Sequence, residues 1–437
     1  MSAPTPIRQF LLLFFLSGVS RLEPKSMENT FPEATARYKE QMHSRNKRDD
    51  TYKIEDDEKV WDLFTTENFT WIDSVFTNRD PSYYNYTGYN SFEPIRNELY
   101  RLADKYEYVT VEVYGKTHEG RELLALHINK EDKDEIVFLN SLIHAREWVV
   151  GCVTMNIIHR ILEYDTEDAK LLLNNFHFII IPVVNPDGYE YTHFKNRMWR
   201  KNREPTLEPG CYGVDVNRNF LYGFKPFVVG SGDSENGPCS ETYHGTKPLM
   251  TKESIGLNLM LFKNRHNMRY YIDYHTFGNY WTNAYGAHGW APKNEKQLGR
   301  YRENVEKSFM DSLGVKWKTG GVFNVIYECH GILVDHVHYY ITPIAFTVEV
   351  GNSHDEFTAP DNRIDTFVIS QWLALVSQLK LLHSDIKSGQ YMQDRIKNWR
   401  RTSMEKRTVL FKREEKRQSY IQSLYKRTLK LIDNNAG

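Results

Sequence analysis

The chain has 437 residues, of which 40% are hydrophobic and 14% aromatic. This composition excludes an intrinsically disordered protein and provides enough apolar residues for one large domain with shorter appendages. The formal net charge of −1 says nothing about partners, and it conceals an asymmetry, because a basic segment at 384–437 follows an acidic body. We expect no nucleic-acid partner.

The N-terminus has the layout of a secretory signal peptide. Arg8 precedes the apolar run F-L-L-L-F-F-L at 10–16, and the small residues Ser17, Gly18 and Ser20 follow it. The run is too short to span a bilayer in the mature protein. We therefore expect residues 1–20 to be a signal peptide and the protein to be secreted.

Residues 21–80 are polar and predict a short pro-segment or linker. The basic stretch R-N-K-R at 45–48 directly precedes an acidic run, which would fit cleavage after Arg48 in an exported protein. A solvated charge cluster within a linker explains the stretch equally well. Two N-x-T acceptors, at Asn68 and Asn85, are consistent with a secreted glycoprotein.

From residue 81 onward the pattern becomes that of an α/β domain. Helical apolar spacing predicts helices at 92–105, 148–163 and 366–383. Apolar runs predict strands at 108–114, 122–128, 136–143, 176–184, 269–275 and 344–350. Because the strands alternate with helices, we expect a mixed, largely buried central sheet with helices on both faces, spanning 81–383.

The segment 384–437 is helix-prone and basic, with a modest apolar stripe. It is predicted to be a helical C-terminal tail. Such a tail could bind anionic glycans or an anionic membrane surface, or it could be a solvated extension.

Four cysteines are present. Cys211 and Cys239 flank a Gly-rich region, where a disulfide would restrain a long loop. Cys152 lies in an apolar helical stretch and Cys329 in a Gly- and His-containing loop, and we expect both to be free thiols.

Three predicted strands carry ionisable residues at their ends. His144 and Glu147 follow the strand at 136–143, His275 ends the strand at 269–275, and Glu349 is embedded in I-A-F-T-V-E-V. Two histidines and one glutamate are the ligand set of a catalytic zinc, with a fourth position left for water. Each motif alone is weak, but a glutamate in an apolar strand indicates a function, since burying an unpaired carboxylate costs several kcal/mol.

A second group of residues is cationic. Arg197 and Arg200 in R-M-W-R, and Asn217 and Arg218 in N-R-N, lie on predicted loops that follow the strand at 176–184. An arginine beside an asparagine amide is suited to binding a planar carboxylate. Taken singly, each arginine is better explained as an ordinary surface residue.

Six motifs occur in a fixed order along the chain. They are H-A-R-E-W at 144–148, N-P-D-G-Y at 185–189, N-R-M-W-R-K at 196–201, V-D-V-N-R-N-F at 214–220, P-C-S-E-T-Y-H-G at 238–245 and F-T-V-E at 346–349. In this order the sequence resembles the zinc metallocarboxypeptidases of the pancreatic A/B type, and the resemblance extends from Tyr83 to His383. It implies a peptidase catalytic domain over 81–383.

The resemblance also implies roles for individual residues. His144, Glu147 and His275 match the ligands of one zinc ion, and Glu349 matches the general base for the zinc-bound water. Arg200 matches the residue that stabilises the oxyanion.

Further residues match substrate-binding and supporting positions. Asn217, Arg218 and Tyr327 match the groups that bind the terminal carboxylate of the substrate, and Arg146 matches an accessory substrate-binding arginine. Asp215 matches the partner that orients His144. Cys211 and Cys239 match the disulfide of the family.

The resemblance places Val334 at the floor of the pocket for the C-terminal side chain, where an apolar residue implies aliphatic or aromatic substrates. Ile332 stands where the family usually has Gly, so we expect a shallower pocket. The remaining positions that match the pocket lining are Thr282, Gly286, Val322, Cys329 and Thr347.

The sequence therefore predicts a monomeric, secreted enzyme that acts on the C-termini of peptides or proteins. One alternative is a catalytically altered relative that binds peptides, and another is an enzyme for blocked amino acids. The retention of the zinc ligands and of Glu349 argues against the first. The retained carboxylate-binding residues argue against the second.

Overall fold

The computed structural model describes residues 84–226, 237–313 and 316–391. Within those ranges an eight-stranded sheet has the order β1-β2-β4-β3-β5-β8-β6-β7. The strands are β1 (Val109–Lys116), β2 (Glu122–Ile128), β3 (Ile136–Ser141), β4 (His177–Ile181), β5 (Met268–Thr276), β6 (Tyr280–Asn283), β7 (Lys318–Gly321) and β8 (Ala345–Val350). The central strands β4, β3, β5 and β8 are parallel, whereas β1 with β2, β2 with β4 and β6 with β8 pair antiparallel. The predicted mixed sheet is confirmed.

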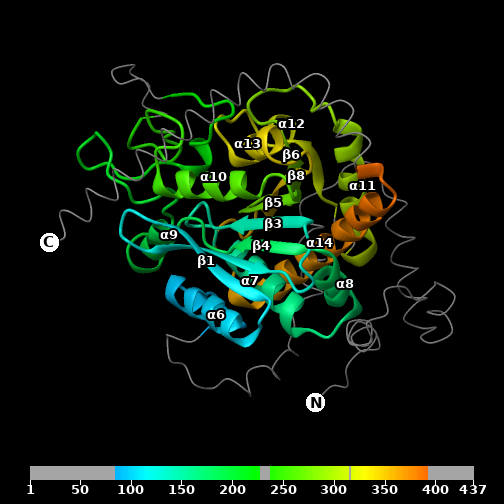
Figure 1. The fold of residues 1–437 in the computed structure, drawn as a ribbon. Helices are drawn as coiled ribbons and strands as arrows, with labels where there is room; N and C mark the ends of the chain where they lie inside the picture. Colours follow the sequence, from blue (N-terminus) through cyan, green and yellow to red (C-terminus); the bar gives the residue numbers. More distant parts are fainter. Residues whose placement is uncertain (1–83, 227–236, 314–315, 392–437) are drawn as a thin grey trace, which may run out of the picture. The chain divides into compact units, whose positions relative to one another are not determined.

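Helices cover both faces of this sheet. They are α6 (Phe92–Lys105), α7 (Trp148–Glu163), α8 (Glu167–Asn175), α9 (Pro186–Phe194), α10 (Lys252–Asn264), α11 (Glu295–Leu313), α12 (Val322–Val325), α13 (Leu333–Tyr340) and α14 (Ile364–Lys387), with short 3₁₀ turns η1 (Val216–Arg218) and η2 (Asp361–Arg363). Figure 1 shows α10 and α13 on one face and α6, α7 and α8 on the other.

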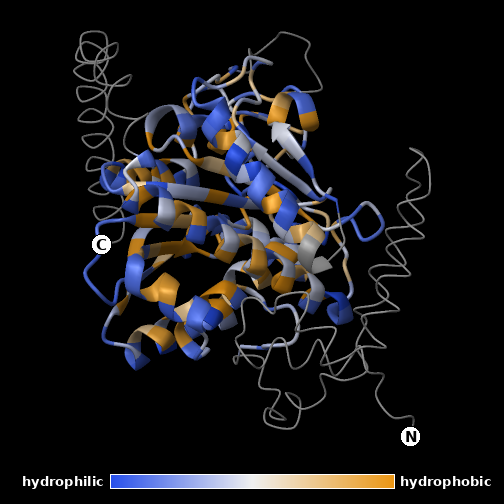
Figure 2. Ribbon diagram, turned by 90° about the vertical axis from the view of Figure 1, so that its right-hand side faces the viewer, coloured by the Kyte–Doolittle hydropathy of each residue, from blue (hydrophilic) through white to orange (hydrophobic). Residues whose placement is uncertain are grey.

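The core lies between these layers. Every residue of β3 is buried, because parallel strands in the middle of such a sheet are covered on both sides. Figure 2 shows the apolar residues concentrated in the central strands and on the inner sides of the helices. Within the described part of the chain, no helix combines the length and the apolarity needed to cross a membrane.

Two predicted strands end earlier than expected, each for a local reason. β3 stops at Ser141 because Leu142 adopts a left-handed backbone conformation with φ of 53°, which extended strands do not allow. β4 stops at Ile181, and the next residue is Pro182, which cannot donate a ladder hydrogen bond.

Some predictions fall on other parts of the chain. The predicted signal peptide at 1–20, the predicted pro-segment or linker at 21–80, and residues 392–437 of the predicted tail lie outside the described residues. The described part of that tail begins within α14, which continues to Lys387.

Candidate metal and catalytic centre

Three ionisable residues meet at the carboxyl ends of neighbouring parallel strands. His144 follows β3, and the next strand in the sheet, β5, contains His275. Glu147 is the N-cap residue of α7, which begins directly after it. All three side chains are buried.

The three side chains direct ligand atoms at one another. Glu147 Oε1 lies 2.8 Å from His144 Nδ1, and Glu147 Oε2 lies 3.1 Å from His275 Nδ1. The two Nδ1 atoms are 3.1 Å apart. One ligand atom from each residue fits within a mutual distance of 4.8 Å. Two imidazoles and one carboxylate, buried and convergent, fit a zinc ion with an open coordination position.

Glu147 is held ionised in this cluster. Burial raises its pKa, but the adjacent His144 and His275 outweigh that effect and bring the pKa well below its ordinary value. A carboxylate that stays charged while buried is a suitable metal ligand, since a ligand must bind in its deprotonated form.

Asp215 connects the cluster to Arg200. Its Oδ1 lies 3.2 Å from His144 Nε2, and its Oδ2 accepts a hydrogen bond of 3.0 Å from Arg200 Nε. Burial raises the pKa of Asp215, but Arg200 and His144 reverse the effect and hold it well below the ordinary value. Arg200 Nη1 in turn lies 3.9 Å from Glu147 Oε1. The guanidinium is therefore fixed beside the three convergent residues.

Glu349 lies on β8, the strand next to β5, and pairs in register with His275. It is half-buried, and burial raises its pKa to about 8. The charges of His275 and Arg200 act in the opposite direction, whereas Glu147 adds to the rise. Glu349 is therefore a carboxylate of raised pKa next to His144, Glu147 and His275, but it does not belong to the group of ligand atoms that those three residues form.

Asn217, Arg218 and Tyr327 form a second group next to the first. η1 carries Asn217 and Arg218, and Asn217 Oδ1 accepts the backbone N–H of Leu333 at 2.7 Å. Arg218 Nη2 donates to Tyr327 Oη at 3.0 Å, although Tyr327 is 54% exposed. A buried guanidinium under an exposed tyrosine is an arrangement in which an anionic group can be covered on binding.

The residues that match the pocket lining also converge. A Cβ added at Gly286 would lie 2.7 Å from both Cys329 Sγ and Ile332 Cδ1, and 3.1 Å from Val322 Cγ1. Val334 is buried in α13 and belongs to the same apolar cluster as Ile332. Thr282 and Thr347 pair across β6 and β8. Val322, Cys329, Ile332 and Val334 belong to one apolar cluster, and Leu333, the residue after Ile332, is hydrogen-bonded to Asn217.

The two remaining arginines occupy different positions. Arg146 lies 4.3 Å above the Phe357 ring, and its Nη1 is 3.3 Å from Glu241 Oε2 at the surface. Arg197 stacks on Trp148 at 3.8 Å and donates to the backbone carbonyl of Arg146. Arg197 therefore supports the backbone of this region and does not join Arg200 and Arg218.

A family model described as zinc carboxypeptidase matches residues 95–374. The chain belongs to the zinc carboxypeptidase family. The match includes every residue described above as converging on the site.

Curated relatives agree with the family. The chain is 35% identical over 269 residues to metallocarboxypeptidase A of Trichophyton tonsurans, covering 58% of this chain and 60% of that protein. It is 29% identical over 280 residues to a zinc carboxypeptidase of Simulium vittatum, covering 63% of this chain and 90% of that protein. The matched region thus spans 60% of the length of the fungal relative.

Solved structures agree with the fold. Carboxypeptidase A from Helicoverpa armigera superposes with a TM-score of 0.64 at 28% identity, covering 77% of this chain and 83% of that one. Bovine thrombin-activatable fibrinolysis inhibitor, solved in complex with tick carboxypeptidase inhibitor, superposes with a TM-score of 0.63 at 25% identity. That alignment covers 69% of this chain and 99% of that one.

The structure confirms the cysteine predictions for this member of the family. Cys211 and Cys239 form a disulfide, and Cys152 and Cys329 are free.

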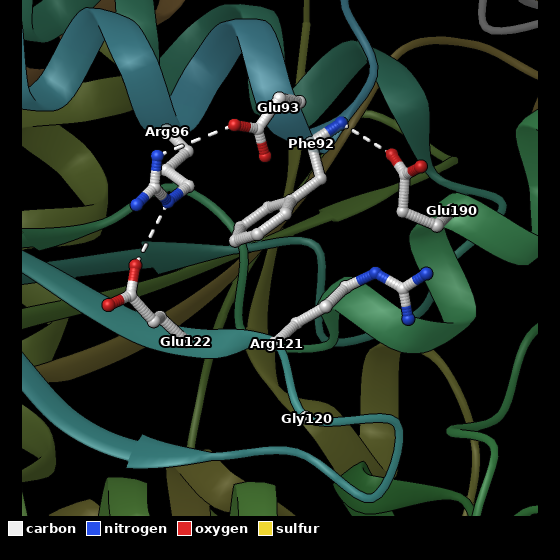
Figure 3. Close-up of a pocket in the computed structure, with 7 residues that line it drawn as sticks. All are labelled: Phe92, Glu93, Arg96, Gly120, Arg121, Glu122 and Glu190. Carbon is white, nitrogen blue, oxygen red and sulfur yellow. Dashed lines mark hydrogen bonds and ion pairs between the residues drawn. The ribbon is translucent and has the colours of Figure 1, made fainter.

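A cavity of about 210 Å³ lies between α6, α9 and the turn that joins β1 and β2. Figure 3 shows Arg96 directed at Glu93 and Glu122, and Glu190 directed at the backbone N–H of Phe92. Arg121, also shown, pairs with Glu119 and Asp187 outside the view, so each charged side chain of the cavity has a partner. The cavity shares no residue with the convergent site. We assign it no part in the chemistry.

The sequence predictions omitted two buried carboxylates beside the site. Asp335, in α13, accepts the backbone N–H groups of Gly286 and Ala287 at 2.9 to 3.0 Å and so fixes the backbone at these two residues. Asp273, in β5, lies 2.7 Å from His275. Both were detectable, because each is an acidic residue within an apolar run of the sequence.

Proposed function

We propose that the protein is a secreted, zinc-dependent metallocarboxypeptidase that removes the C-terminal residue of peptides and proteins, with a preference for hydrophobic residues. One observation supports this proposal above all. Glu349 pairs in register with His275, next to a buried set of potential zinc ligands and Arg200. Residues 81–383 are the proposed catalytic domain, with a signal peptide at 1–20, a short pro-segment or linker at 21–80 and a basic tail at 384–437.

His144, Glu147 and His275 would hold one zinc ion. The ion would supply a Lewis acid that polarises the carbonyl of the scissile bond and increases the acidity of water. The residues of this chain supply the remaining steps.

Glu349 is the proposed general base. Its carboxylate takes a proton from the attacking water and then delivers it to the nitrogen of the departing amino acid. A group that both accepts and donates a proton works best when its pKa is near the working pH. The raised pKa of Glu349 supports that dual role. A bound cation nearby would favour the ionised form that starts the cycle.

Arg200 is the proposed oxyanion-stabilising residue. Its guanidinium is fixed by Asp215, whose Oδ2 lies 2.9 Å from Nη2 and 3.0 Å from Nε. It therefore needs no rearrangement when negative charge develops on the carbonyl oxygen. Asp215 Oδ1 also faces His144, so this one carboxylate would fix the position of the zinc ligand His144 relative to Arg200.

Asn217, Arg218 and Tyr327 are the proposed carboxylate-binding residues. Their recognition of a free carboxylate restricts cleavage to the last residue and positions its peptide bond at the zinc site. Arg146 lies at the rim and would contact the substrate further from its end. Val334 and the residues around Gly286 would then contact the C-terminal side chain, and their apolar character supports the hydrophobic preference.

A panel of N-blocked dipeptides that differ only in their last residue tests the proposal. We expect release of Leu or Phe in preference to Lys or Arg, no release from the matched C-terminal amides, loss of activity with a zinc chelator and recovery with added zinc. A preference for basic residues would contradict the pocket assignment, and chelator-insensitive cleavage would contradict the mechanism. Tight binding of the dipeptides by the zinc-loaded protein without turnover would instead favour the peptide-binding alternative.

A further inference from the structure

Asp273 is a fully buried carboxylate that the proposed chemistry does not use. It precedes His275 by two residues in β5, so strand alternation places both side chains on the same face of the sheet. Its Oδ2 lies 2.7 Å from His275 Nε2. Its Oδ1 accepts a hydrogen bond of 2.6 Å from Asn140 Nδ2, and Asn140 Oδ1 accepts one of 2.6 Å from Tyr271 Oη. The carboxylate is therefore fixed on both sides.

The two nitrogens of His275 face different groups. Nδ1 faces Glu147 and His144 at 3.1 Å each, on the side where the ligand atoms converge. Nε2 faces Asp273. An imidazole that binds a metal through Nδ1 must carry its proton on Nε2, and a hydrogen-bond acceptor there fixes that tautomer and the ring orientation.

Asn217 cannot perform this task, although its Nδ2 lies 3.3 Å from His275 Nε2. Asn217 Oδ1 accepts the backbone N–H of Leu333, so the amide is oriented with its donor toward the imidazole. A protonated Nε2 needs an acceptor, and Asp273 provides one.

The environment of His144 offers a comparison. Its Nε2 faces Asp215 at 3.2 Å, but Asp215 also accepts from Arg200 and caps the N–H of Asn217. Asp273 has the shorter contact to its histidine, and its other partner is a neutral amide. The charge of Asp273 is therefore directed mainly at His275.

We propose that Asp273 is a positioning residue of the metal centre, which orients His275, holds its Nε2–H tautomer and strengthens Nδ1 as a ligand, with Asn140 and Tyr271 fixing Asp273. The proposal rests on the zinc site of the proposed function. It adds a second carboxylate–histidine pair to the pair formed by Asp215 and His144.

Zinc affinity of the full-length protein tests this role. The metal is removed with a chelator, and the affinity for zinc is measured by competition with a chromophoric chelator of known affinity. In Asp273→Asn, the single amide oxygen cannot serve both Asn140 and His275. We expect the zinc dissociation constant to increase ~10- to 100-fold, as for removal of other outer-shell partners of metal-binding histidines.

Two measurements separate positioning from a general structural role. The melting temperature of the metal-free Asp273→Asn protein should lie within a few degrees of that of the metal-free wild type. Added zinc should raise the melting temperature of the variant less than it raises that of the wild type. Asp335→Asn is the matched control. Asp335 is also a fully buried carboxylate with hydrogen-bond partners, but those partners are backbone N–H groups and not a proposed zinc-binding histidine. Its zinc affinity should equal that of the wild type.

The outcomes are distinguishable. A wild-type chain that binds no zinc would contradict the proposed function itself. A wild type that binds zinc, together with a folded Asp273→Asn variant of equal affinity, would overturn only this inference. If Asp273→Asn does not fold, Asn140→Ala serves as the test, because it frees Asp273 to move. For Asn140→Ala we expect a smaller loss of zinc affinity than for Asp273→Asn. A zinc affinity equal to that of the wild type would overturn the proposal.

Discussion

Replacing Ile332 by alanine tests the wall of the proposed substrate pocket. Ile332 is buried at the start of α13, and its Cδ1 would lie 2.7 Å from a Cβ at Gly286. The substitution removes Cγ1, Cγ2 and Cδ1, and a larger substrate side chain that fills the space would gain about 2 kcal/mol, at ~0.8 kcal/mol per buried methylene. We therefore expect the ratio of kcat/KM for C-terminal Phe to that for Val to rise about 30-fold, since 1.4 kcal/mol corresponds to a factor of ten.

The assay presents both blocked dipeptides in one reaction and compares the amounts of Phe and Val released. Because the two substrates compete for the same enzyme molecules, the ratio does not depend on how much of the variant is folded or loaded with zinc. Val337→Ala is the matched control, since Val337 is buried on the same helix and in the same apolar cluster. It should lower stability and leave the ratio unchanged. An unchanged ratio in Ile332→Ala would refute the placing of Ile332 in the pocket wall.

Three further outcomes are expected. Burial lowers the pKa of His336 to about 3, and both of its ring nitrogens lack a partner in the described structure. Below its ordinary pKa of about 6.5 the unfolded chain takes up a proton at this imidazole and the folded protein does not, so stability falls as the pH falls. His336→Phe should therefore lose about 2 kcal/mol less free energy of unfolding than the wild type between about pH 7 and pH 5, measured by denaturant titration; equal losses would contradict this. Arg218→Lys keeps the charge but loses the planar fork, so kcat/KM for a free C-terminus should fall ~10- to 100-fold in steady-state kinetics, and unaltered kinetics would remove Arg218 from carboxylate binding. Replacing Cys211 and Cys239 together by serine should lower the free energy of unfolding by about 3 to 4 kcal/mol, because the disulfide joins residues separated by 28 positions; a loss under ~1 kcal/mol would contradict the loop-closure reasoning.

Local sequence patterns predicted some elements well and could not predict others. The helices expected at 92–105 and 148–163 are found at those residues, because their apolar spacing reflects a buried face. The predicted set omits α11, although Leu298, Tyr301 and Val305 recur at helical spacing and are buried. β6 and β7 have four residues each, too few for any periodicity to be detected.

The candidate site depended on contacts that no local pattern contains. His275 and Glu349 become neighbours because β5 pairs with β8, and residues 277–344 separate those strands in the chain. From the sequence, only the resemblance carried by the ordered motifs predicted that His275 and Glu349 belong to one site. The order of the arginines along the chain did not show that Arg197 stacks on Trp148 whereas Arg200 pairs with Asp215. Strand alternation could have predicted that Asp273 lies on the same face of the sheet as His275. Its hydrogen bond from Asn140 could not be predicted, because it depends on the pairing of β3 with β5.

The kinetics of Glu349→Gln test the central claim most directly. Glutamine keeps the shape of the side chain but cannot take a proton from water, and general-base catalysis contributes typically 10²- to 10⁴-fold to the rate. We expect kcat on a blocked dipeptide ending in Leu to fall by ~10³-fold or more, while the variant retains one zinc per chain and wild-type affinity for a competitive inhibitor with a free carboxylate. Turnover close to that of the wild type, in a Glu349→Gln protein fully loaded with zinc, would contradict the assignment of Glu349 as the base.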